Sequence, residues 1–162
     1  MTIKTIITEP NKILRQVSKP VPAVGNEERK LMDDMLETMY AANGIGLAAI
    51  QIGIPKRIIV MDISKDGKKN PMYFVNPIIN NKDKEKTTYE EGCLSVPDYF
   101  AEVDRPKYCE VEYLDYNGKS KVLEADGLLA TCIQHEMDHL EGILFTVSYT
   151  HLTLPTNTTV FV

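Results

Sequence analysis

The sequence lacks tryptophan and has only three histidines and three cysteines among its 162 residues. A small, odd number of cysteines argues against a disulfide framework and favours a reducing compartment. No apolar run approaches the ~20 residues of a membrane span, and the N-terminus has no signal-like apolar core. The net charge of −5 argues against a broad basic face for nucleic acid. We therefore expect a cytoplasmic protein with no membrane segment and no direct nucleic-acid site.

What is present fits one globular domain, with 43% hydrophobic and 25% charged residues. Two stretches, 26–42 and 127–141, have the periodicity of amphipathic helices. In the first, Leu31, Met35 and Met39 recur at four-residue spacing on one helical face. The second is predicted to be the central helix of the fold.

Between these helices the sequence favours β-structure. β-Branched and alternating runs predict strands, which cover 57–63, 72–79, 107–116 and 120–125. Asn117-Gly118 separates the last two and predicts a β-hairpin with a type I′ turn. The expected fold class is α+β, with antiparallel strands packed around a central helix, for which the motif described next predicts metal binding.

The second helix contains the motif His135-Glu136-Met137-Asp138-His139. Side chains four residues apart share one helical face, so both imidazoles can bind a single metal ion. Glu136 follows the first ligand and can act on water as a general base without binding the metal. The alternative is a polar helix surface with accidental histidines, which apolar neighbours and the rarity of histidine make the weaker interpretation.

Two histidines leave a catalytic site one protein ligand short. In one class of zinc peptidases a third histidine follows, but Phe145 stands at that position here. Glu141 would face away from the pair, and His151 lies in an atypical segment. Cys93, which follows the flexible Gly92, is the best upstream candidate, although by itself it fits a buried apolar position equally well. The other two cysteines fit buried positions better.

Three segments together resemble a known family. Gly44-Ile45-Gly46-Leu47-Ala48-Ala49-Ile50-Gln51, Glu91-Gly92-Cys93-Leu94-Ser95 and the helix motif 135–139 are similar, in order and spacing, to the signature motifs of peptide deformylases. The resemblance covers about residues 3–145. A proline commonly stands where Ile50 is, and we expect this departure to have little effect.

The resemblance implies a peptide-deformylase-like fold and a metal-dependent hydrolase. Such an enzyme removes the N-formyl group from the N-terminal methionine of new polypeptides and releases formate. It implies that Cys93, His135 and His139 hold one divalent ion, natively ferrous iron, with zinc, nickel or cobalt as replacements. Glu136 would serve as the general base and then the general acid.

The resemblance also implies a substrate site. The Gln51 side chain and the Leu94 backbone N–H would stabilise the oxyanion, and Glu91 would pair with Arg105. An extended N-formylmethionyl peptide would bind beside a strand, its methionine in an apolar pocket. The residues expected to contact the substrate are Ile45, Gly46, Glu91, Leu128 and Cys132, with His135 completing the pocket.

The expected partners are N-formylmethionyl nascent chains, met at the ribosome, and the protein is expected to be a monomer. Two rival interpretations stay open. A zinc endopeptidase of the HExxH type would use the same helix to cut internal bonds. A structural metal module would need four protein ligands, and only three good candidates are present.

The last residues differ from the rest of the chain. Residues 146–162 contain no Asp, Glu, Lys or Arg and six threonines. We assign 1–145 to the catalytic domain and interpret 146–162 as a sequencing or cloning artefact, translated adapter DNA in place of the family's charged C-terminal helix. A natural β-rich tail is the alternative.

Overall fold

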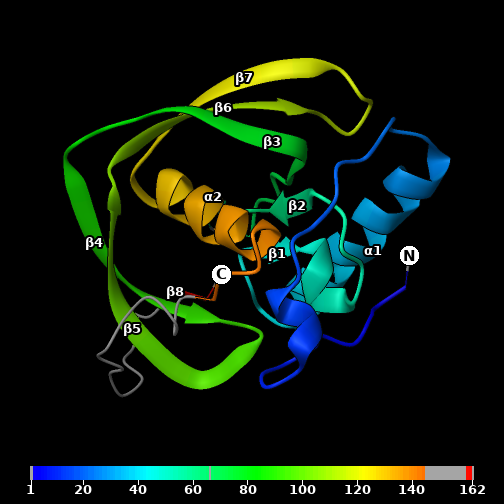
Figure 1. The fold of residues 1–162 in the computed structure, drawn as a ribbon, viewed down its shortest axis with the longest axis horizontal. Helices are drawn as coiled ribbons and strands as arrows, with labels where there is room; N and C mark the ends of the chain where they lie inside the picture. The colour runs from blue at the N-terminus through cyan, green and yellow to red at the C-terminus, as the bar shows by residue number, and fades with distance from the viewer. Residues whose placement is uncertain (1, 66, 145–159, 162) are drawn as a thin grey trace.

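The computed structural model describes residues 2–65, 67–144 and 160–161. These residues form two α-helices and eight strands, which confirms the expected α+β class. Figure 1 shows how they are arranged. The helices are α1 (Asn26–Ala41) and α2 (Gly127–Leu140), with short 3-10 helices η1 (Lys12–Arg15) and η2 (Ala49–Ile52). The strands are β1 (Gly46–Ala48), β2 (Ile58–Met61), β3 (Met72–Lys82), β4 (Lys86–Cys93), β5 (Val96–Pro106), β6 (Tyr108–Leu114), β7 (Ser120–Asp126) and β8 (Val160–Phe161).

The strands form two sheets around a central helix. One sheet has the order β1-β2-β3-β6-β7 and is antiparallel throughout. The other has the order β5-β4-β8, and β8 pairs with β4 in parallel at Glu91 and Gly92. In Figure 1, α2 crosses the middle of the molecule, and the long β4–β5 hairpin bends around it. Helix α1 lies at the periphery beside β1 and β2.

Each helix buries its apolar face in a separate core, because the two faces of the larger sheet are both covered. The core around α2 includes Ile59, Phe74, Val111, Ile133 and Leu140. The core around α1 includes Met32, Met35, Met39, Val60 and Val75. No helix among the described residues combines the length and apolar character that crossing a membrane requires.

Both predicted helices are confirmed, and each ends where a residue takes a left-handed conformation. Asn43 follows α1 with φ of 58°, and Gly44 N donates to Met39 O at 3.0 Å. Gly142 follows α2 with φ of 73°, and Ile143 N donates to the carbonyl of Asp138 at 2.9 Å. These bonds satisfy carbonyls that a helix end otherwise leaves unpaired.

The predicted hairpin is confirmed as β6–β7, but its predicted type I′ turn is wrong. That turn needs positive φ at both central residues, whereas here Gly118 has φ of 80° and Asn117 is not among the residues with positive φ. The Asp115 carboxylate explains the longer loop. It accepts from the backbone N–H groups of Asn117 and Lys119, both at 2.9 Å.

Strands β4 and β5 were not predicted as strands, although they form the longest hairpin of the fold. They pair from Lys86 opposite Pro106 to Cys93 opposite Val96. Only three residues, 83–85, separate β3 from β4. The hairpin matters for function because its tip holds the cysteine of the candidate site.

Candidate metal centre

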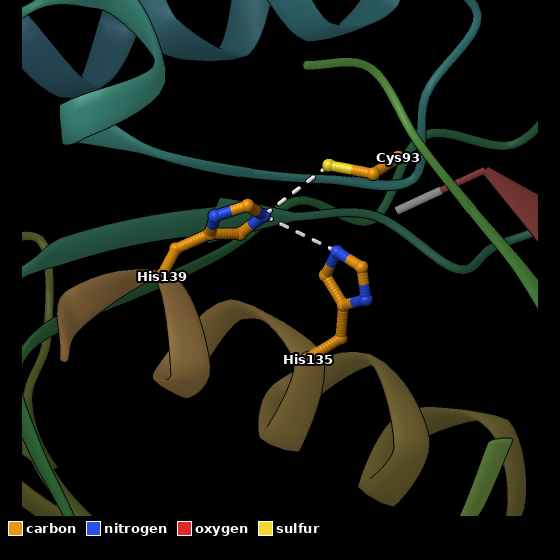
Figure 2. Close-up of side chains that lie close together, drawn as sticks. All are labelled: Cys93, His135 and His139. Atoms are coloured by element: carbon orange, nitrogen blue, oxygen red, sulfur yellow. Dashed lines mark hydrogen bonds between the residues drawn. The ribbon is translucent and has the colours of Figure 1, made fainter. Parts of the chain in front are cut away.

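The structure brings together the three residues expected to bind a metal. Their ligand atoms all lie within 4.8 Å of one another. Cys93 Sγ is 3.4 Å from His139 Nε2, which is 3.2 Å from His135 Nε2 (Figure 2). A zinc-sized ion bound tetrahedrally by two nitrogens and a sulfur separates them by roughly 3.3–3.6 Å. The donor set therefore has the dimensions of a metal site.

Two separate elements supply these ligands. Helix α2 presents both histidines from one face, as their four-residue spacing requires. The tip of the β4–β5 hairpin presents Cys93, opposite the helix (Figure 2). All three side chains are at most 2% exposed. A metal bound here would therefore be shielded from most competing water.

A buried carboxylate fixes the orientation of the first histidine. Glu91 Oε1 lies 2.9 Å from His135 Nδ1, so Nδ1–H donates to the carboxylate and Nε2 is left for a metal. Arg105 pairs with the same carboxylate through Nε at 2.8 Å and Nη2 at 3.0 Å, which confirms the expected pairing. Arg105 Nη1 also donates to Asp138 Oδ2 at 3.0 Å. Burial raises the pKa of Glu91, but His135 and Arg105 outweigh it and hold that pKa below its usual value.

Glu136 is fully buried, and neither carboxylate oxygen has a hydrogen-bond partner among the described residues. Burial raises the pKa of this carboxyl well above its ordinary value, with Arg105 opposing and Glu91 reinforcing the shift. Gly46 lies directly against it, because a Cβ built there would be 2.9 Å from Glu136 Oε1 and 3.0 Å from Cys132 Sγ. The main chain at Gly46 is therefore so close to the Glu136 carboxyl that any side chain at this position would collide with it.

Gln51 is fully buried on η2. Its Oε1 accepts from the Ala48 backbone N–H at 2.9 Å, which fixes the orientation of the amide. Its Nε2 donates to Ser95 Oγ at 3.0 Å and lies 3.8 Å from Cys93 Sγ. The amide N–H groups therefore point toward the metal ligands, where a donor to a developing oxyanion is needed.

Four of the residues expected to contact the substrate lie next to this centre, namely Ile45, Gly46, Glu91 and Cys132. Cys132 Sγ is 4.0 Å from the Ile45 carbonyl oxygen, and Leu128 precedes Cys132 by one helical turn. Leu94 occupies the turn at the hairpin tip, and its side chain packs where a Cβ on Gly44 would sit. Cys132 and Gly46 thus lie next to Glu136, while the carboxylate of Glu91 is engaged by His135 and Arg105.

The charges of the centre fit a divalent cation. Burial and the neighbouring Glu136 raise the pKa of the Cys93 thiol well above its ordinary value. Burial, with His135 and Arg105 nearby, lowers the pKa of His139 well below its usual value, so its imidazole is neutral. A thiol and a carboxyl that burial keeps protonated both become stable anions beside a metal ion. The residues present therefore fit the metal that their spacing predicts.

Comparison with known proteins agrees with this geometry. The family model described as polypeptide deformylase matches residues 3–153. The chain belongs to the polypeptide deformylase family. A peptide deformylase of Pelagibacter ubique is 75% identical over 146 residues, which is 90% of this chain and 85% of that relative.

Solved structures of deformylases share the fold. That of Ehrlichia chaffeensis in complex with actinonin has a TM-score of 0.89 at 44% identity, over 93% of this chain and 90% of that one. A deformylase of Acinetobacter baumannii with bound Met-Ala-Ser has a TM-score of 0.87 at 34% identity, over 91% and 99%. Identities above 30% over nearly whole chains make this deformylase an enzyme of the same family, not merely of the same fold.

Two contacts of the deformylase site were missed from the sequence. Asp138 was taken as part of the motif without a role, yet it binds Arg105. Its position three residues after His135, near the same side of the helix, was the available signal. Ser95, the partner of Gln51, gave no signal, because 44 residues separate the two. His151 and Phe145, weighed as a third ligand and as its replacement, lie outside the described residues.

Proposed function

We propose that this deformylase removes the N-formyl group from the N-terminal formylmethionine of new polypeptides and releases formate. The observation that carries the proposal is the buried centre itself. Cys93, His135 and His139 offer three ligands, and Glu136 lies beside them with no hydrogen-bond partner in the described part of the chain. Three protein ligands leave a position for water or substrate, as in catalytic metal sites.

Different residues of the site carry out different steps of amide hydrolysis. A bound divalent ion would supply Lewis-acid chemistry, polarising a carbonyl and lowering the pKa of water toward ~7. Glu136 takes the proton from the attacking water and passes it to the departing amine nitrogen. Gln51 Nε2–H and the Leu94 backbone N–H donate to the formyl oxygen as it becomes negative. One such donor typically contributes about 2.7–4 kcal/mol to lowering the barrier.

Substrate binding is proposed along Ile45 and Gly46, with the methionine side chain between Ile45, Leu128 and Cys132. Support comes from the 4.0 Å distance between Cys132 Sγ and the Ile45 carbonyl oxygen, and from the lack of a side chain at Gly46, which leaves its backbone groups accessible to a peptide. Glu91, expected among the substrate contacts, is instead proposed to act through His135, because its carboxylate is already bound on two sides.

Formate release from formyl-Met-Ala-Ser by metal-loaded protein tests the function. We expect stoichiometric formate and free methionyl peptide, with internal peptide bonds intact. Cleavage of internal bonds, with indifference to the formyl group, would instead support the zinc endopeptidase alternative. Intact metal occupancy with no formate released would contradict the proposal.

The native metal is proposed to be ferrous iron, with zinc, nickel or cobalt as replacements, since one thiolate and two imidazoles suit all of these ions. Metal analysis of protein purified without oxygen tests this, and zinc as the main metal there would contradict it. The proposed setting is the cytoplasm, where a monomer acts on nascent chains at the ribosome.

We propose that the catalytic domain is 1–145 and that 146–162 is an appended artefact. The uncharged, threonine-rich composition supports this. Val160 and Phe161 form a two-residue pairing with β4. Sequencing the source locus tests the proposal, and an uninterrupted natural reading frame through Val162 would overturn it in favour of the natural β-rich tail.

A further inference from the structure

A cavity of about 300 Å³ opens beside the segment that leads into the metal centre. Its lining includes Asn43, Gly44 and Ile45, together with Lys68 and Lys69 from the β2–β3 connection. The catalytic proposal uses only Ile45 of these residues. The cavity is therefore available for a part of the substrate other than the formylmethionine.

The order of residues along its wall relates the cavity to the reaction. Gly46 lies at the reacting end, because its backbone approaches Glu136 so closely. From there the chain passes Ile45 and Gly44 into the cavity wall. A peptide that binds beside this segment with its formyl group at the metal centre extends its next residues toward the cavity.

The described residues that line the cavity carry a net positive charge, from two lysines and one aspartate. Asp62 also lines it, but this carboxylate is only 6% exposed and is bound by Tyr40 Oη at 2.5 Å, Ser64 N at 2.9 Å and Asn70 N at 3.0 Å. Lys68 and Lys69 are exposed.

One of these lysines has a defined position on the wall. Lys69 Nζ lies 4.6 Å from the centroid of the Tyr40 ring, within the range of a cation–π contact. Asp66 lies outside the described residues, and the connecting segment 64–70 carries three lysines against this one aspartate.

We propose that Lys68 and Lys69 make this deformylase favour substrates with an acidic side chain at the second or third residue, directly after the formylmethionine. The inference rests on the proposed function and adds to it a charge preference. An exposed pair contributes little on its own, so the expected preference is modest, and salt weakens it.

Formyl-Met-Ala-Glu, formyl-Met-Ala-Gln and formyl-Met-Ala-Lys, with a second series that varies the second residue, test the preference. At low salt we expect kcat/KM to fall in the order Glu, Gln, Lys in at least one series, with roughly three- to tenfold between the extremes. The difference should lie in KM and shrink at 0.5 M salt. In the double variant K68E/K69E the order should reverse.

The double variant K84E/K86E is the matched control, because both lysines are exposed at the end of β4 that is remote from Cys93. It should keep the wild-type order. Equal kcat/KM for all three peptides in both series, or an order that K68E/K69E leaves unchanged, would overturn the inference. No formate from the uncharged glutamine peptides would instead overturn the proposed function.

Discussion

Glu136 and Cys93 are both buried beside the two histidines, but their proposed duties differ, and single substitutions separate them. Glu136→Ala should bind metal normally and lose turnover by about 10²–10⁴-fold, because a general base is lost while all ligands remain. Cys93→Ala should lose the metal. Metal content by elemental analysis and formate release measure both effects. Normal metal binding by Cys93→Ala would show that the third ligand is wrong.

Gly46 gives a second test at the scale of a residue. In Gly46→Ala the new methyl group would lie 2.9 Å from Glu136 Oε1, closer than van der Waals contact allows. We expect the carboxyl to be displaced and kcat to fall at least tenfold with metal retained, since displacements of about 1 Å are costly in catalysis. Gly25→Ala is the control, because a Cβ there meets only Glu28 Oε1 at 3.4 Å. Equal kcat in both variants would contradict this role for Gly46.

The sequence alone could predict only the part of this site whose residues are close together in the chain. His135, Glu136 and His139 share one helix, so their spacing reports their geometry directly. Cys93 and Gln51 lie far away along the chain. The search for a third ligand led to Cys93 without excluding a buried apolar role for it, and only the resemblance to deformylases singled out Gln51. The 3.0 Å bond from Gln51 to Ser95 depends on tertiary packing, which spacing does not encode.

Among the elements, the β4–β5 hairpin is joined to α2 by a buried ionic network centred on Arg105. Arg105→Leu leaves Glu91 buried without its cation, which should reduce the free energy of unfolding by about 3–5 kcal/mol. Metal affinity should also fall by about 10–100-fold, because Glu91, which orients His135, loses the cation that holds it in place. Urea unfolding and metal competition measure the two effects.

The exposed pair of Arg15 and Glu9 is the matched control for Arg105→Leu. Their nitrogen and oxygen are 2.6 Å apart, but the side chains are 48% and 21% exposed. Arg15→Leu should therefore change the free energy of unfolding by less than about 1 kcal/mol. A similar loss in the two variants would mean that the network around Arg105 contributes no more than a surface ion pair.

That network also explains why β4 and β5 were missed while α1, α2 and the β6–β7 hairpin were predicted. Helices and hairpin follow the rule that apolar residues face inward. Along β4 and β5 the buried positions include Glu91 and Arg105, which interrupt the apolar alternation. Two buried charges that pair across strands look like exposed residues in the sequence.

Asp62 links the end of α1 to the β2–β3 connection and predicts a pH dependence. Burial raises its pKa, but hydrogen bonds from Ser64 and Tyr40 outweigh burial and hold the pKa below its ordinary value. Its ionised form therefore stabilises the fold above about pH 4, and this contribution is lost as the pH falls through the folded-state pKa.

Asp62→Asn should thus cost about 1–3 kcal/mol at neutral pH. The difference from wild type should shrink below about pH 4. Unfolding curves from pH 3 to 7 provide the measurement. If the stability difference between wild type and Asp62→Asn instead grew as the pH fell, the pKa of Asp62 would not be lowered by folding.

For the whole molecule, a metal bound by Cys93, His135 and His139 would join the central helix to the hairpin that encloses it. An ion present at about 1,000 times its dissociation constant stabilises the fold by about 4 kcal/mol. Its removal by a chelator should lower Tm on the order of 10 °C, measured by calorimetry. Cys93→Ala serves as the reference, and its Tm should not respond to the chelator. An unchanged wild-type Tm would mean that the ligands do not bind metal in the folded protein.

The separation of the ligands along the chain makes the metal a reporter of folding order. Cys93 and His139 are 46 residues apart, and closing a loop of that length costs an unfolded chain about 3 kcal/mol in entropy. The complete ligand set should therefore form only after the hairpin has docked on α2. In refolding with cobalt present, the visible absorption of the thiolate complex should appear after the far-ultraviolet signal of the helices. The rate at which this absorption appears would then measure how fast the hairpin docks on α2.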